Sequence, residues 1–126
     1  MEFLNKIKFN TQGIVPAIVQ EEKTGKVLML GWMNKEAIEK TILTKKVHFW
    51  SRSRKKMWLK GETSGHYQLV REIYIDCDED TLLLKVEQIK AACHKGYKSC
   101  FFRKVNSEGK LEVVEKKVFE PEEVYK

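Results

Sequence analysis

The chain reads QLVREIYIDCDEDTLLLKVEQ from Gln68 to Gln88. The β-branched and aromatic residues of this stretch predict one strand over Gln68–Ile75 and another over Leu82–Gln88. Between them lies the segment Asp76-Cys77-Asp78-Glu79-Asp80, in which a cysteine is surrounded by carboxylates. Thiolates suit zinc, and carboxylates suit magnesium or calcium, so the stretch predicts metal chemistry within a β-rich fold.

Strands also dominate the rest of the sequence. Ile14–Gln20 and Val27–Met33 predict a hairpin, with Pro16 at an edge position or a strand start. Asn34 is a good N-cap for a helix that runs to about Thr44. The sum is an α+β fold, mainly antiparallel β, with one clear helix. Further strands are predicted at Val47–Trp50, Met57–Lys60, Phe101–Val105 and Leu111–Val114, with a loop over 62–66 and an edge strand or tail in the last dozen residues.

Length and charge narrow the class of protein. A chain of 126 residues predicts a single domain over 1–126. Its 24 Lys and Arg residues against 18 Asp and Glu residues give a net charge of +6, which is typical of a protein with an anionic partner such as nucleic acid or a phosphorylated small molecule. A solubilising lysine surface accounts for the charge equally well. No apolar run approaches the roughly 20 residues of a membrane span, and no signal peptide is recognisable, so a cytoplasmic location is expected. In that reducing compartment three cysteines are more readily ligands or thiols than disulfides.

The cysteines and carboxylates can be grouped by their spacing. If the strand from Gln68 continues through Asp80, its period of two places Asp76, Asp78 and Asp80 on one face and Cys77 on the other. Cys93 and Cys100 follow downstream, and Gly96 between them permits a tight turn that would bring their sulfurs together. With Cys77 they make three sulfur ligands, and the fourth position is left for water, substrate or His94, the pattern of catalytic zinc sites.

Simpler interpretations of these residues stay open. A single cysteine is often a small buried hydrophobe, and an acidic turn is usually just solvated. Cys93 and Cys100 could form a redox pair, although they lack the Cys-x-x-Cys spacing. A purely structural zinc site closed by His94 is a further alternative.

A second dense region, residues 48–68, is basic and aromatic. Arginine forks and Ser or Thr hydroxyls bind phosphate oxygens, and tryptophan offers a face for a purine. The same residue types can bind single-stranded nucleic acid. The simplest alternative is a hairpin with a lysine-rich turn and tryptophans in the core.

Together, these segments resemble the phosphoribosyl-AMP cyclohydrolases, enzymes of histidine biosynthesis. The resemblance covers roughly residues 12 to 104, and Lys95 stands where the family usually has a small residue or Thr. Four ordered motifs are more specific than any one of them. They are VLMLGWMNKEA (27–37), WSRSR (50–54) with WLKGETSGH (58–66), DCDED (76–80) with LLLKV (82–86), and ACHKG (92–96) with SCF (99–101).

The resemblance implies a compact, barrel-like or twisted-sheet structure with one or two helices, built as an intertwined homodimer. It implies one Mg²⁺ per subunit on Asp76, Asp78 and Asp80. It also implies one Zn²⁺ per subunit on Cys93 and Cys100, with Cys77 supplied by the other subunit. The reaction implied is hydrolysis of the N1–C6 bond of the adenine ring of 1-(5-phosphoribosyl)-AMP by a zinc-activated water.

Roles for the remaining residues are hypotheses within that resemblance. His94 near the zinc and His66 near the substrate are the candidate acid/base groups, because histidine titrates near neutrality. The alternative to catalysis is a zinc-containing nucleic-acid-binding module. As an enzyme, the protein is expected to bind neither nucleic acid nor a membrane. The candidate substrate-binding residues are Ser51, Arg52, Arg54, Lys60 and Ser64 for phosphate and Trp50 (or Trp58) for the base.

Overall fold

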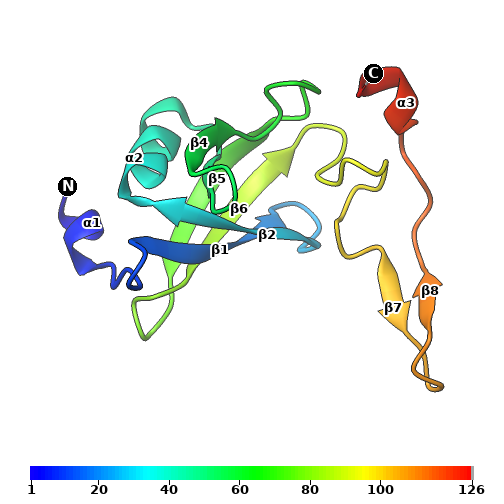
Figure 1. Ribbon diagram of the computed structural model, residues 1–126, viewed down its shortest axis with the longest axis horizontal. Helices are drawn as coiled ribbons and strands as arrows, with labels where there is room; N and C mark the ends of the chain where they lie inside the picture. The colour runs from blue at the N-terminus through cyan, green and yellow to red at the C-terminus, as the bar shows by residue number, and fades with distance from the viewer. Residues whose placement is uncertain (126) are drawn as a thin grey trace.

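The computed structural model describes residues 1–125, which form eight strands and three helices (Figure 1). The helices are short except for α2. The elements in chain order are α1 (Glu2–Lys6), β1 (Ile14–Glu21), β2 (Val27–Asn34), α2 (Lys35–Thr44), β3 (His48–Ser51), β4 (Lys56–Leu59), β5 (Gln68–Ile75), β6 (Leu82–Gln88), β7 (Arg103–Val105), β8 (Leu111–Val113) and α3 (Pro121–Val124).

The main sheet has four strands in the order β2-β1-β6-β5. β1 pairs with β2 and β5 pairs with β6 in antiparallel fashion, as expected for a mainly antiparallel fold. β1 and β6, however, run parallel. The sheet is open, so the barrel-like closure expected from the resemblance is wrong for this chain. β3–β4 and β7–β8 form two further antiparallel pairs.

The position of Pro16 corrects one expectation and confirms another. β1 is a central strand, so an edge position for Pro16 is wrong. The pairing of β1 with β6 begins only at Ala17, opposite Leu82. Proline cannot donate a backbone hydrogen bond, and it is therefore tolerated at the start of β1, ahead of the first β6 partner.

The predicted helix is confirmed as α2. The Asn34 side chain accepts a 2.8 Å hydrogen bond from the backbone N–H of Ala37, as an N-cap does. The helix ends at Thr44, and the residue that caps it, Lys45, has a left-handed backbone (φ 61°). Ala37 and Ile38 are buried against the sheet, in one core with the apolar side chains of β1, β2 and β6. No helix of residues 1–125 is long and apolar enough to cross a membrane.

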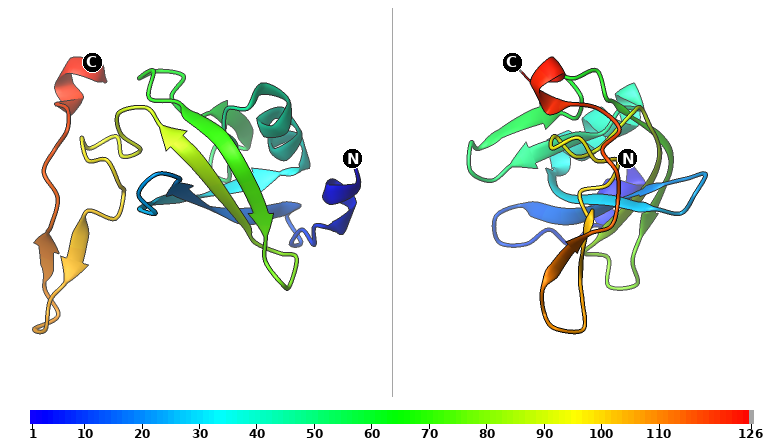
Figure 2. Two further views of the ribbon diagram at one scale, coloured as in Figure 1. Left: turned by 180° about the vertical axis from the view of Figure 1, so that it is seen from behind. Right: turned by 90° about the vertical axis from the view of Figure 1, so that its right-hand side faces the viewer.

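The C-terminal third stands apart from the sheet. The β7–β8 hairpin projects beyond it, as Figures 1 and 2 show from several sides. Its Val105, Leu111 and Val113 are each more than half exposed. Beyond the hairpin the chain returns toward the sheet and ends in α3, where sequence patterns predicted an edge strand or a tail. α1 and α3 bring the number of helices above the one or two expected.

Candidate functional site

Three aspartates converge in the turn between β5 and β6. One carboxylate oxygen from each of Asp76, Asp78 and Asp80 lies within 4.8 Å of the others, and all three residues are exposed. The Asp76 carboxylate organises the turn, because it accepts hydrogen bonds from the backbone N–H groups of Asp80 (3.0 Å) and Thr81 (3.2 Å). Such a set of oxygens has the donor chemistry that Mg²⁺ or Ca²⁺ prefers.

The grouping of these aspartates was predicted for the wrong reason. β5 ends at Ile75, so no strand continues through Asp80 and strand alternation does not apply. The carboxylates meet because the chain turns: the Asp76 backbone carbonyl accepts a 3.0 Å hydrogen bond from the Glu79 N–H, and Glu79 adopts a positive φ of 62°. Cys77 lies in this same turn and is exposed.

Cys93 and Cys100 lie together at the other end of β6. The loop between them closes through backbone hydrogen bonds from Cys93 N–H to Tyr97 (3.2 Å) and from Gly96 N–H to Cys93 (3.2 Å). The two thiols lie near enough to each other to interact. Burial and this neighbouring thiol raise the pKa of Cys100 to about 11, so in the metal-free chain the Cys100 sulfur favours the protonated form. A bound cation would reverse this preference.

Lys60 lies beside this cysteine pair. It follows β4, and its ammonium donates a 2.5 Å hydrogen bond to the Ala92 carbonyl, next to Cys93. Burial lowers the pKa of Lys60, while the charges of Cys100 and Cys93 act to raise it. Lys60 was predicted to hold phosphate, which stays a prediction; its ammonium also lies near enough to the two sulfur atoms for their charges to act on it. An ammonium there favours thiolate, the form that binds zinc.

Cys77 does not join this pair within one chain. Among residues 1–125, no third cysteine, histidine or carboxylate has a ligand atom that groups with both sulfurs within 4.8 Å. Cys77 precedes β6 and Cys93 follows it. A strand of that length spans about 20 Å, so the chain cannot fold Cys77 onto Cys93 and Cys100 without breaking the sheet. One chain therefore offers two sulfurs, an incomplete set for zinc.

A polar cavity of about 390 Å³ opens next to the cysteine pair. It gathers residues from the loop after β3, from β4 and its following loop, from the cysteine loop and from the C-terminus. Predicted residues Arg54, Lys60, Ser64 and His94 all line it, so these four come together as expected. The other lining residues are Tyr125, which sequence patterns did not group with them, and five from the basic and aromatic region 48–68, namely Trp58, Leu59, Gly61, Glu62 and Thr63.

Other predicted residues are not among those lining the cavity. The Arg52 guanidinium lies over the ring of Trp32, 4.6 Å from its centroid. The Ser51 hydroxyl accepts a 3.2 Å hydrogen bond from the Arg54 N–H and thereby shapes the basic turn. Trp50 is half-buried in β3. Trp58, rather than Trp50, is the tryptophan that reaches the cavity.

His66 is a buried residue near the end of the loop that joins β4 to β5. Its ring stands edge-on to that of Phe119, with the ring centroids 4.8 Å apart. Its Nδ1 finds no hydrogen-bond partner within residues 1–125. Burial lowers the pKa of His66, and the positive charges of Lys90 and Lys60 add to the effect, so the ring is neutral near pH 7. His94, by contrast, is exposed at the rim of the cavity.

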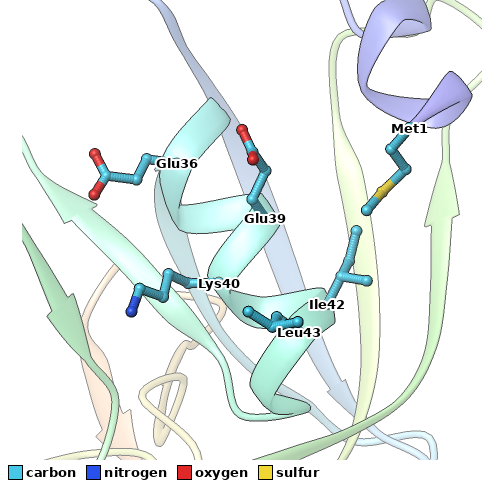
Figure 3. Close-up of a pocket in the computed structure, with 6 residues that line it drawn as sticks. All are labelled: Met1, Glu36, Glu39, Lys40, Ile42 and Leu43. Carbon is cyan, nitrogen blue, oxygen red and sulfur yellow. The ribbon is translucent and has the colours of Figure 1, made fainter.

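A second pocket lies far from this chemistry. It is formed by α2 and the N-terminus, and Figure 3 shows Met1 pointing toward Ile42 with Leu43 beside it. The charged ends of Glu36, Glu39 and Lys40 point away from this apolar notch in the same view. None of the predicted metal or substrate residues lines it.

Comparison with known proteins shows the family of this chain. The sequence profile described as phosphoribosyl-AMP cyclohydrolase matches residues 29–102, which include the cavity-lining loops, the acidic turn and both downstream cysteines. Relatives named phosphoribosyl-AMP cyclohydrolase match almost the whole chain. The one from Chlorobium phaeovibrioides is 58% identical over 123 residues, 98% of this chain and 90% of its own length. That of Pelotomaculum thermopropionicum is 57% identical over 122 residues, 97% of this chain and 95% of its own. The chain belongs to the phosphoribosyl-AMP cyclohydrolase family.

Proposed function

We propose that this protein hydrolyses the N1–C6 bond of the adenine ring of 1-(5-phosphoribosyl)-AMP, the third step of histidine biosynthesis. One observation carries the proposal beyond family membership. A cavity with cationic and hydroxyl groups lies directly beside a pair of thiols that a cation would turn into metal ligands. The substrate carries two phosphates, which the net charge of +6 also favours.

The donor sets fit the two metals expected. Zn²⁺ would be held by Cys93 and Cys100, and Mg²⁺ by Asp76, Asp78 and Asp80. When bound, zinc lowers the pKa of a coordinated water toward about 7 and so supplies a nucleophile at neutral pH. Lys60 assists by placing a positive charge next to the thiols, which opposes their protonation.

The side chains that line the cavity are assigned to phosphate binding and to proton transfer. Arg54, Thr63 and Ser64 supply a guanidinium and two hydroxyls for phosphate oxygens. The reaction joins a water oxygen to C6 and breaks the C6–N1 bond, so one proton must leave the water and one must reach N1. His94 lies exposed at the rim of the cavity, which suits it to move that proton. His66 is neutral and buried, and we assign it to the substrate side of the site.

The complete zinc site is proposed to form only in a homodimer. Each chain holds Cys93 and Cys100 at one end of β6 and Cys77 at the other, so Cys77 must come from a second copy if all three bind one ion. The exposed apolar side chains of the β7–β8 hairpin, directly after Cys100, offer a surface that a second copy would cover. Because Cys77 belongs to the acidic turn, the magnesium site of one chain would then lie close to the zinc site of the other.

The test combines metal analysis with an absorbance assay of ring opening. The purified chain should contain about one zinc per subunit. Chelation should abolish turnover, and zinc with magnesium should restore it, which is the control for irreversible damage. A zinc-loaded chain that binds oligonucleotides but leaves 1-(5-phosphoribosyl)-AMP unchanged would refute the enzyme and favour a binding module.

A further inference from the structure

The C-terminal segment, residues 114–125, is fastened along the cysteine loop. The Val118 N–H donates a 2.7 Å hydrogen bond to the Gly96 carbonyl, and the Val114 N–H donates a 2.9 Å bond to Phe102. Glu115, which is mostly buried, forms a 2.6 Å ion pair with Lys26 of the turn between β1 and β2. These contacts give the segment a fixed path over the site, although the family profile ends at residue 102.

The C-terminal segment passes very close to the loop between Cys93 and Cys100. A Cβ atom added to Gly96 would lie 2.6 Å from the Phe119 carbonyl oxygen, so only glycine permits this contact. From there the Phe119 ring reaches His66 edge-on. The segment therefore touches both the loop that carries Cys93 and the buried histidine.

The end of the segment enters the cavity. Tyr125 lines it together with Arg54, Lys60, Ser64 and His94. The Tyr125 N–H donates a 2.7 Å hydrogen bond to the Pro121 carbonyl, which closes α3, and the ring packs against Phe119 with the centroids 6.2 Å apart. Figures 1 and 2 show α3 beside the loop that follows β4. Apart from Trp58, Tyr125 is the aromatic ring that this lining offers among residues 1–125.

We propose that Tyr125 is a substrate-binding residue, whose ring packs against the heteroaromatic ring of the nucleotide. The inference rests on the proposed function. Arg54, Thr63 and Ser64 in the cavity lining provide hydrogen-bond donors for the phosphates. The ring of Tyr125, which packs against Phe119, is apolar and planar and therefore suits the planar part of the substrate. Stacking of a base on an aromatic side chain is worth roughly 1–3 kcal/mol, so losing it costs about tenfold or more in affinity.

The experiment compares three variants in the ring-opening assay. Tyr125→Ala should raise KM about tenfold and leave kcat within about twofold, since the ring binds the substrate and moves no proton. Tyr125→Phe keeps the ring and should keep the wild-type KM. Glu122→Ala, an exposed change on α3, the helix just before Tyr125, and outside the cavity, is the matched control and should behave as wild type.

The outcomes separate this inference from the function on which it rests. A wild-type chain with no turnover would overturn the proposed function itself. Normal wild-type turnover with an unchanged KM in Tyr125→Ala would overturn the inference alone. A Tyr125→Phe variant as impaired as Tyr125→Ala would overturn the ring contact, because the hydroxyl would then be the group that matters. Circular dichroism confirms that each variant is folded.

Discussion

Replacing Gly96 by alanine tests how the C-terminal segment is held on the cysteine loop. Gly96 has a φ of +103°, a region that costs a residue with a side chain about 1–3 kcal/mol. The added Cβ would also lie 2.6 Å from the Phe119 carbonyl oxygen. The segment must then shift, which weakens the Val118–Gly96 hydrogen bond at a cost of about 1 kcal/mol. The expected loss for Gly96→Ala is therefore about 2–4 kcal/mol in free energy of unfolding.

Gly109→Ala is the matched control. Gly109 also has a positive φ, +79°, but nothing lies within 4 Å of an added Cβ. Gly109→Ala should therefore lower the free energy of unfolding by only about 1 kcal/mol. Urea denaturation at one fixed protein concentration gives both values, and hydrogen exchange at the Val118 amide reports the local release of the segment. Equal losses for the two variants, or an unchanged exchange rate at Val118, would refute the close packing of the segment on the loop.

Three further expectations concern the cavity and His66. Arg54→Ala should raise KM about tenfold, from the loss of a charged hydrogen bond, whereas Lys55→Ala in the same turn should not; equal effects would remove Arg54 from phosphate binding. His94→Ala should lower kcat by about a hundredfold with little change in KM, and an unchanged kcat would clear it of proton transfer. Because the folded pKa of His66 lies below its ordinary 6.5, the unfolded chain takes up its proton first as the pH falls. Its contribution to stability is present above pH 6.5 and is lost as the pH drops through the folded pKa; an NMR titration midpoint at or above 6.5 would contradict its burial.

Local features of the fold were predictable from the sequence. Runs of β-branched and other apolar residues located β1, β2, β5 and β6 to within a residue or two, and Asn34 marked the start of α2 through its capping side chain. The parallel pairing of β1 with β6 was not predictable. It joins segments some 65 residues apart, as in the pair Ala17 and Leu82, and no local pattern records such a choice of partner.

In the candidate site, too, local features were predictable from the sequence and long-range contacts were not. Residue type and spacing identified the metal-ligand candidates, since few other residues in this chain have that chemistry. Sequence patterns did not indicate, however, that Lys60 lies near the cysteine pair, because its contact with Ala92 joins residues 32 positions apart in the chain. They also missed Phe119 and Tyr125, which carry no motif and reach the site only because the segment after β8 turns back over the cysteine loop.

The most direct test of the shared zinc site is complementation between two inactive variants, Cys77→Ser and Cys93→Ser. If Cys77 of one chain completes the pair of the other, a mixed dimer has one intact site and one doubly damaged site. Unfolding and refolding the two variants together in equal amounts should therefore restore about a quarter of wild-type activity, because half of the dimers are mixed. Bound zinc should return in the same proportion. A mixture no more active than either parent, while co-refolded wild type recovers fully, would contradict a zinc site shared between subunits.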